Sequence, residues 1–239
     1  MYEGLAKAFS NEIQTLSGGK LQCIPYSRAL LDFFEARGKP AQPLVARAVV
    51  FRNQNHIDWF DLLKLIPGIP NRLFKEATQS PNANGMIRLQ IPQIDTSSQK
   101  SFKLPYRIIG FPHGTAELGS YHVDGTWNGH IVVCVDETLI DLTIGQLNDS
   151  RLSIDFTPPW VTIETDPGFL SGRNGLVGVQ DGMLVIYWAY PDERTYEDSN
   201  SWGTNPEFLS QLKYFGSQFA ETLQSLSDRE LEAKELELP

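Results

Sequence analysis

The most informative stretch of this 239-residue chain is residues 127–143, which read WNGHIVVCVDETLIDLT. Two runs of mostly β-branched and aliphatic residues, Ile131–Val135 and Leu139–Leu142, lie on either side of a short polar segment. Such runs are typical of β-strands, and the polar residues between them favour a turn. The stretch therefore predicts a β-hairpin. An even connecting loop, such as Asp136-Glu137, and an odd one give two different registers.

The register of this hairpin decides whether His130 and Asp141 are neighbours. With an even loop Asp141 lies opposite Val132, and Val132 shares a face with His130 because side chains alternate along a strand. His130 and Asp141 are then diagonal neighbours, a geometry in which a carboxylate orients an imidazole that acts as a general base. With an odd loop they lie on opposite faces. Each is then an ordinary residue at a strand end that forms its hydrogen bonds with the backbone or with water.

The rest of the chain predicts helices at both ends and further strands between them. Apolar residues three or four apart indicate a helix that ends before Gly18-Gly19, and Cys23–Gly38 carries the early proline and final glycine of a second helix. A third helix is predicted over residues 205–230. Further predicted strands are Pro43–Arg52, Tyr106–Phe111 and Met183–Tyr190. We expect an α+β fold in which helices pack on a mainly antiparallel sheet.

Residues 1–239 are expected to form a single domain. Within it, residues 67–105 are rich in Pro, Ser, Gln and Asn and lack sustained periodicity, so they are either a long irregular excursion or a lid over a site. Gly172–Gly178 has the glycines of a phosphate-binding loop but not the Lys and Ser or Thr that follow in such loops. We interpret it as a hairpin or surface loop.

The composition argues against several classes of partner. The chain has 20 Lys and Arg against 29 Asp and Glu, a net charge of −9, whereas nucleic acids and anionic membranes are bound through clustered Lys and Arg. The longest apolar run is too short to span a bilayer. Two cysteines are too few for a disulfide scaffold. We expect a cytoplasmic protein with no nucleic-acid or membrane partner, while the sequence leaves the oligomeric state open.

The two cysteines differ in their predicted surroundings. Cys23 lies at the predicted start of a helix, where the helix dipole and unpaired backbone N–H groups favour a thiolate. The alternative is that Cys23 is an ordinary small apolar residue at the start of a core helix. Cys134 lies inside a predicted strand, which indicates structural packing.

The order of these residues resembles a known family. A helix that starts at Cys23 is followed, more than a hundred residues later, by the strands Gly129–Val133 and Ile140–Thr143. This set is similar to the Cys-His-Asp core of the papain-like superfamily, and most of all to its transglutaminase-like branch. The resemblance implies a papain-like, transglutaminase-like fold, with Cys23 as nucleophile, His130 as general base and acid, and Asp141 as the orienting carboxylate.

The same resemblance implies a reaction class. A Cys-His-Asp triad forms an acyl-enzyme on the cysteine, here Cys23, and so catalyses hydrolysis, deamidation or transamidation of a peptide or protein amide. The reaction needs no cofactor and no metal.

The oxyanion hole is less well defined by the sequence. Papain-like peptidases typically have a Gln six residues before the nucleophile, a position that Ser17 occupies here. The backbone N–H of Cys23 is the first expected donor to the developing oxyanion, and Gln22 and Asn128 are candidates for the second. Trp127 is a candidate wall of the cleft, with packing in a core or loop as the alternative.

Two other functions stay open. Ser17 and Ile24 replace the Gln and Trp that papain-like peptidases usually carry, so a non-catalytic binding or effector module on the same fold is one alternative. The other is a metal site, and its residues would be His113, His122, Asp124 and His130. Their spacing matches no metal-ligand motif, so we expect no metal.

Overall fold

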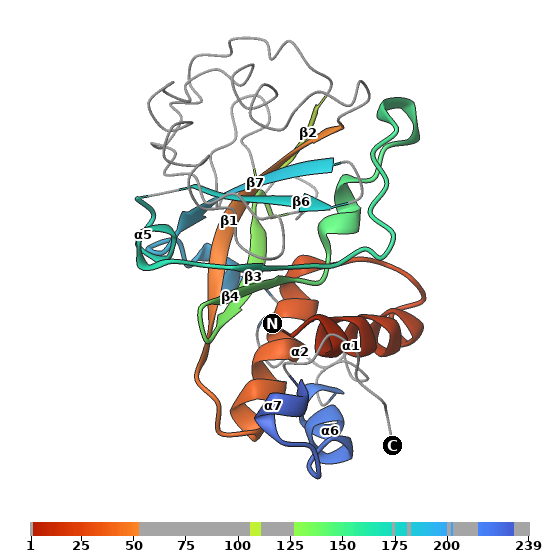
Figure 1. Cartoon of the computed structure of the whole chain (residues 1–239), viewed down its shortest axis with the longest axis vertical. Helices are drawn as coiled ribbons and strands as arrows, with labels where there is room; N and C mark the ends of the chain where they lie inside the picture. Colours follow the sequence, from red (N-terminus) through yellow and green to blue (C-terminus); the bar gives the residue numbers. More distant parts are fainter. Residues whose placement is uncertain are drawn as a thin grey trace.

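The fold is an antiparallel sheet with helices packed against one of its faces (Figure 1). The computed structural model describes residues 2–52, 106–110, 127–173, 175–180, 183–199, 202 and 215–231. The predicted lid at residues 67–105 lies outside the described residues. So do His113, His122 and Asp124 of the alternative metal site.

Four helices form the helical layer beside the sheet, gathered below the strands in the view of Figure 1. They are α1 (Glu3–Leu16), α2 (Cys23–Ala36), α6 (Phe215–Thr222) and α7 (Asp228–Leu231). The first two confirm the helices predicted from the sequence. Gly18 and Gly19, directly after α1, have positive φ angles of 63° and 78°, a conformation that glycine adopts without strain.

The prediction of one continuous C-terminal helix over residues 205–230 is wrong. Within the described part, α6 ends at Thr222 and α7 starts only at Asp228. Ser227 and Glu230 form a capping box, in which Glu230 Oε2 accepts from the Ser227 N–H at 2.7 Å and Ser227 Oγ accepts from the Glu230 N–H at 3.4 Å. This pair starts a new helix instead of extending the old one. The guanidinium of Arg37 also donates to two carbonyls of the intervening turn.

The strands follow the order β5-β4-β3-β1-β7-β6, with β2 also paired to β1, and every pair is antiparallel. Their bounds are β1 (Ala41–Arg52), β2 (Tyr106–Ile109), β3 (His130–Val135), β4 (Thr138–Asp141), β5 (Val161–Glu164), β6 (Gly175–Gln180) and β7 (Met183–Tyr190). The predicted α+β class and mainly antiparallel sheet are confirmed. Strands β5 and β6 were not predicted, and β6 begins inside the loop expected at Gly172–Gly178.

Short helical segments lie between and after the later strands. They are η1 (Ile144–Leu147), η2 (Ser150–Leu152), α5 (Pro167–Leu170) and η3 (Thr195–Asp198). None of the helices in the described part of the chain is long and apolar enough to cross a membrane.

The sheet separates two apolar cores. Val133 and Ile140 pack on the helical face, together with Phe9 and Phe33 from α1 and α2. On the opposite face the packing involves β3, β4, β6, β7 and α5. The sheet curls around this second core, because a Cβ at Gly178 of β6 would meet the side chain of Ile163 on β5. The two outermost strands of the sheet order therefore approach each other.

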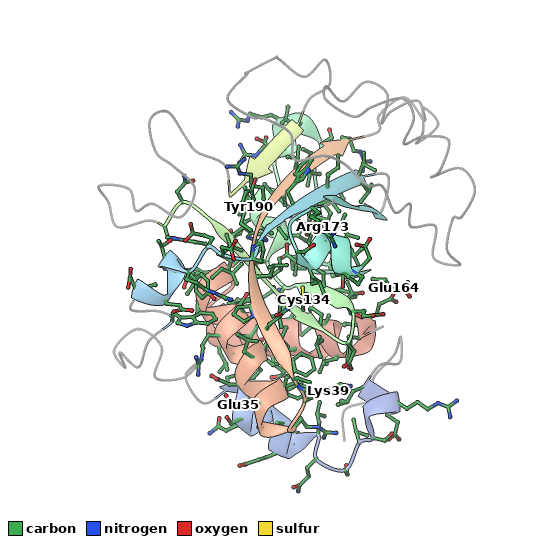
Figure 2. The ribbon with its side chains drawn as sticks, turned by 90° about the vertical axis from the view of Figure 1, so that its left-hand side faces the viewer. Glu35, Lys39, Cys134, Glu164, Arg173 and Tyr190 are labelled. Atoms are coloured by element: carbon green, nitrogen blue, oxygen red, sulfur yellow. The ribbon has the colours of Figure 1, made fainter. Side chains whose placement is uncertain are left out.

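The β3–β4 hairpin has the register that brings His130 and Asp141 together. Its loop is the two-residue Asp136-Glu137, and both residues have positive φ angles, 45° and 59°, as a type I′ turn requires. The pairing Val133↔Ile140 places Asp141 beyond it, level with Val132. The even-loop prediction is confirmed. The turn is held by Lys39, labelled in Figure 2, whose Nζ lies 2.6 Å from Asp136 Oδ2.

Candidate active site

A buried histidine–carboxylate pair lies at the open end of the β3–β4 hairpin. His130 is the first residue of β3 and Asp141 the last of β4, and His130 Nε2 lies 2.6 Å from Asp141 Oδ2. Both side chains are completely buried. The predicted diagonal contact between these two residues is therefore confirmed.

The Asp141 carboxylate accepts hydrogen bonds on both oxygens. Besides His130, Oδ2 accepts from the Tyr187 hydroxyl at 2.8 Å, while Oδ1 accepts from the Thr143 N–H at 2.8 Å and its hydroxyl at 3.3 Å. A buried carboxylate is stable only when its oxygens are satisfied in this way. Neither Thr143 nor Tyr187 is among the site residues predicted from the sequence. Thr143 carries a local signal, because an Asp two residues earlier favours an Asx-type turn, whereas Tyr187 is 46 residues away.

The environment of His130 favours the protonated imidazole. Burial lowers the pKa of His130, but the charge and hydrogen bond of Asp141 outweigh burial and raise that pKa to about 10, and Cys23 adds to the increase. The imidazole therefore holds a proton at neutral pH. A proton on a buried imidazole is well placed for delivery to a leaving group.

Cys23 approaches this pair from the helical layer. It is the first residue of α2, is partly exposed, and packs against a cluster of Ile24, Val45, Trp127, Ile131 and Tyr196. Helix α2 is fixed to β3 at this point, since Ser27 Oγ donates to the Ile131 carbonyl at 3.1 Å. The start of the helix therefore stays next to the start of the strand.

His130 Nδ1 is the nitrogen that remains for Cys23, because Nε2 is bound to Asp141. Nδ1 is buried and has no hydrogen-bond partner among the described residues. The Cys23 side chain nevertheless lies near enough to contribute to the raised pKa of His130. The thiol and Nδ1 thus approach each other without forming a regular hydrogen bond in this structure.

The N-terminus of α2 supplies free backbone donors beside the thiol. The N-cap is Gln22, and its side chain makes no capping hydrogen bond. Pro25 lacks an N–H, and the Tyr26 N–H donates to the Gln22 carbonyl at 3.2 Å. Within the described part of the chain, the N–H groups of Cys23 and Ile24 have no hydrogen-bond acceptor. They are oriented along the helix axis, as a developing oxyanion requires.

Of the other predicted site residues, Trp127 is held most tightly. Its ring covers Gly129, where a Cβ would overlap the ring, and its Nε1 donates to Thr195 Oγ1 at 3.0 Å. The ring also meets Tyr196 edge-on at a centroid distance of 6.1 Å. Trp127 thus combines packing with a place in the cluster that Cys23 contacts. Asn128, next to it, is buried.

The second cysteine has the structural role that its position in the sequence predicted. Cys134 is buried among the strands, as Figure 2 shows, and burial raises the pKa of its thiol to about 12. It is therefore a poor nucleophile at neutral pH. In the described part of the chain, no group of three or more His, Cys, Asp or Glu is arranged to hold a metal ion.

Comparison of the chain with protein-family models, with curated proteins and with solved structures found no match. The function must therefore be argued from the site itself. Its parts are a thiol at a helix N-terminus, a buried imidazole with one free nitrogen, and a carboxylate bound to the other nitrogen. Together they can activate a sulfur nucleophile and move one proton.

Proposed function

We propose that this chain is a thiol-dependent acyl-transfer enzyme that forms an acyl-enzyme on Cys23. The observation that carries the proposal is the buried His130–Asp141 pair, whose free Nδ1 lies where α2 presents Cys23. The resemblance to the transglutaminase-like branch of the papain-like superfamily leads to the same assignment. The proposed substrate is a peptide or protein amide.

The reacting form in the first half of the proposed reaction is a thiolate–imidazolium pair, in which the proton of the Cys23 thiol already lies on His130 Nδ1. The thiolate attacks the carbonyl carbon of the amide, and the carbonyl oxygen becomes an oxyanion that accepts from the free N–H of Cys23. The imidazolium then gives its proton to the leaving nitrogen as the C–N bond breaks. An amine departs, and the acyl group remains on Cys23 as a thioester.

In the second half, water or an amine resolves the thioester. His130 Nδ1 takes a proton from the incoming nucleophile, which forms a bond to the acyl carbon, and the C–S bond breaks to restore the Cys23 thiolate beside the protonated imidazole. Water gives hydrolysis or deamidation, and an amine gives transamidation. Asp141 keeps the ring of His130 in place through both halves by its hydrogen bond to Nε2. No cofactor or metal enters these steps.

The test uses p-nitrophenyl acetate, an activated ester that needs no knowledge of the natural substrate. We expect a burst of p-nitrophenol, a 1:1 acetyl adduct on Cys23 by peptide mass spectrometry, and continued turnover. The His130→Ala variant should slow acetylation by about 10²–10⁴-fold because it removes the proton-transfer group. The matched control is Cys134→Ser, which removes the other thiol and should leave the burst unchanged.

A non-catalytic binding or effector module on the same fold predicts a different result. Cys23 would then acetylate no faster than a free thiol in an unfolded peptide of the same sequence, and His130→Ala would leave the rate unaltered. That outcome, in protein shown to be folded by circular dichroism, contradicts the enzyme proposal.

A further inference from the structure

Tyr187 contacts the proposed catalytic pair although it lies far from it in the sequence. It is a residue of β7, and the sheet order places β1 and β3 between β7 and the strand that carries Asp141. Its hydroxyl nevertheless donates to Asp141 Oδ2 at 2.8 Å, and both side chains are completely buried. For a hydrogen bond to reach across two intervening strands, the side chains of those strands must leave space for the tyrosine ring.

That space comes from small side chains on β1. Ala48 is paired with Tyr187, and Ala46 is paired with His130, so both alanines share the face on which the hydroxyl and the imidazole lie. Both are completely buried. Their small size, together with the curl of the sheet, leaves room for the ring to extend across β1 toward Asp141.

We propose that Tyr187 is a positioning residue of the site: its hydroxyl holds the Asp141 carboxylate in line with His130 Nε2 and competes for the same oxygen, and so lets the imidazole release its proton. This inference rests on the proposed acyl-transfer function. Two groups compete for the same oxygen, because Oδ2 accepts from both His130 and Tyr187. Each donor takes part of the negative charge that the other would otherwise receive.

The hydroxyl is a permanent donor. Burial, followed by the charge of Asp141, raises the pKa of Tyr187 well above its usual value, so the hydroxyl is protonated at neutral pH. Among the described residues, the titratable groups that face His130 are Asp141 from β4 and Cys23 from α2. The residues of β1 on this face, among them Ala46 and Ala48, are apolar. Removal of the Tyr187 hydroxyl therefore removes one hydrogen-bond donor from Asp141 Oδ2 and changes no titratable group beside His130.

The sign of the effect follows from this competition. Without the hydroxyl, Oδ2 carries more negative charge and attracts the imidazolium proton more strongly. We expect Tyr187→Phe to move the His130 titration midpoint upward by roughly 0.5–1 pH unit, the effect of one hydrogen bond of ordinary strength. A proton that is held more tightly is delivered less readily to a leaving group.

The experiment is a pH titration of His130 by NMR in ¹⁵N-histidine-labelled protein. The wild-type chain is compared with Tyr187→Phe and with Tyr2→Phe. The control is closely matched, because the Tyr2 hydroxyl donates to Asp136 Oδ2 at 2.6 Å and so forms a tyrosine–aspartate hydrogen bond at the other end of the same hairpin. Only Tyr187→Phe should move the midpoint. An unmoved or lowered midpoint in that variant overturns the proposal.

A second replacement keeps the test decisive if Tyr187→Phe does not fold. Incorporation of 3-fluorotyrosine at position 187 preserves the ring and makes the hydroxyl a stronger donor, so it should lower the His130 midpoint. The two replacements should thus shift the His130 titration midpoint in opposite directions. If Tyr187 only packed against its neighbours, the midpoint would not follow the strength of the hydroxyl as a donor. A midpoint that does not fall with 3-fluorotyrosine counts against the role of Tyr187.

Kinetics separate this inference from the proposed function. Tyr187→Phe should slow acylation by a p-nitroanilide, whose leaving group needs a proton, about three- to tenfold. Acylation by a p-nitrophenyl ester, whose leaving group needs none, should change less than twofold. An inert Cys23 in the wild-type protein contradicts the proposed function alone. Equal effects on both substrates in an active protein contradict the role of Tyr187 alone.

Discussion

The tightest packing around the site is at Gly129, directly before His130. The Trp127 ring occupies the space of any Cβ at this position, so the ring can keep its place only if residue 129 is glycine. We expect Gly129→Ala to lower the free energy of unfolding by about 1–3 kcal/mol, the usual cost of overpacking. Urea denaturation followed by circular dichroism measures the change.

A double-mutant cycle gives the control for that prediction. In a Trp127→Ala background the ring is gone, so the extra methyl group meets no obstacle and Gly129→Ala should cost much less. An equal cost of Gly129→Ala in both backgrounds would show that the ring does not explain the glycine.

The residue scale also shows what the sequence can and cannot predict about the site. His130 and Asp141 are separated by 11 residues within one hairpin, and strand alternation predicts their contact once the connecting loop has an even number of residues. Cys23 is marked by its place at the start of a helix. The Tyr187 hydrogen bond depends instead on the curl of the whole sheet, which no local pattern specifies.

Among the secondary-structure elements, α2 matters most, because its two ends have different roles. Its start presents Cys23, while at its C-terminal end the Arg37 guanidinium donates to the carbonyls of Leu223 and Leu226 at 2.7 Å and 2.6 Å. We expect Arg37→Met, which keeps an apolar stem without donors, to lower the free energy of unfolding by about 1–3 kcal/mol. The measurement is again urea denaturation.

The same variant should leave the site intact. Helix α2 has 14 residues, so its ends lie about 20 Å apart at the usual rise per residue. The rate of Cys23 acetylation in native buffer should change less than twofold. The matched control for stability is Arg28→Met. Arg28 is partly exposed and makes two surface contacts, an ion pair with Asp32 one turn away and a cation–π contact with the Trp202 ring, and each contributes at most about 1 kcal/mol at an exposed position. Equal destabilisation by both variants would contradict a specific role for Arg37.

The elements that the sequence analysis missed have identifiable causes. Strand β5 has alternating burial but only four residues, too few for a clear period of two. Strand β6 contains Gly175 and Gly178, and glycine weakens any strand signal. Position 178 has room only for glycine because the Ile163 side chain packs against it, and such a tertiary contact has no local sequence pattern. The break between α6 and α7 does have a local signal, the Ser-x-x-Glu capping box that begins at Ser227.

On the scale of the whole molecule, the buried pair couples stability to pH. The pKa of His130 is raised from 6.5 to about 10 in the folded chain. A group with a raised pKa contributes stability that is fully present below pH 6.5 and is lost as the pH rises toward 10. We therefore expect the free energy of unfolding, measured in urea, to fall steadily between about pH 6.5 and 9.5.

His130→Gln is the control for this pH dependence, since glutamine retains a donor for Asp141 but does not titrate. The difference in unfolding free energy between the wild-type chain and the variant should shrink as the pH rises. A difference that stays constant across this range would mean that His130 does not carry its proton in the folded state.

The candidate site draws its residues from α2, β3, β4 and β7, which together span most of the chain. Contacts between residues so distant in sequence form late, because a long loop must close before each one is made. During synthesis, Cys23 leaves the ribosome long before the strand that carries Tyr187 exists. A nascent chain therefore lacks the assembled site, and the proposed acyl-transfer chemistry becomes possible only as the sheet is completed.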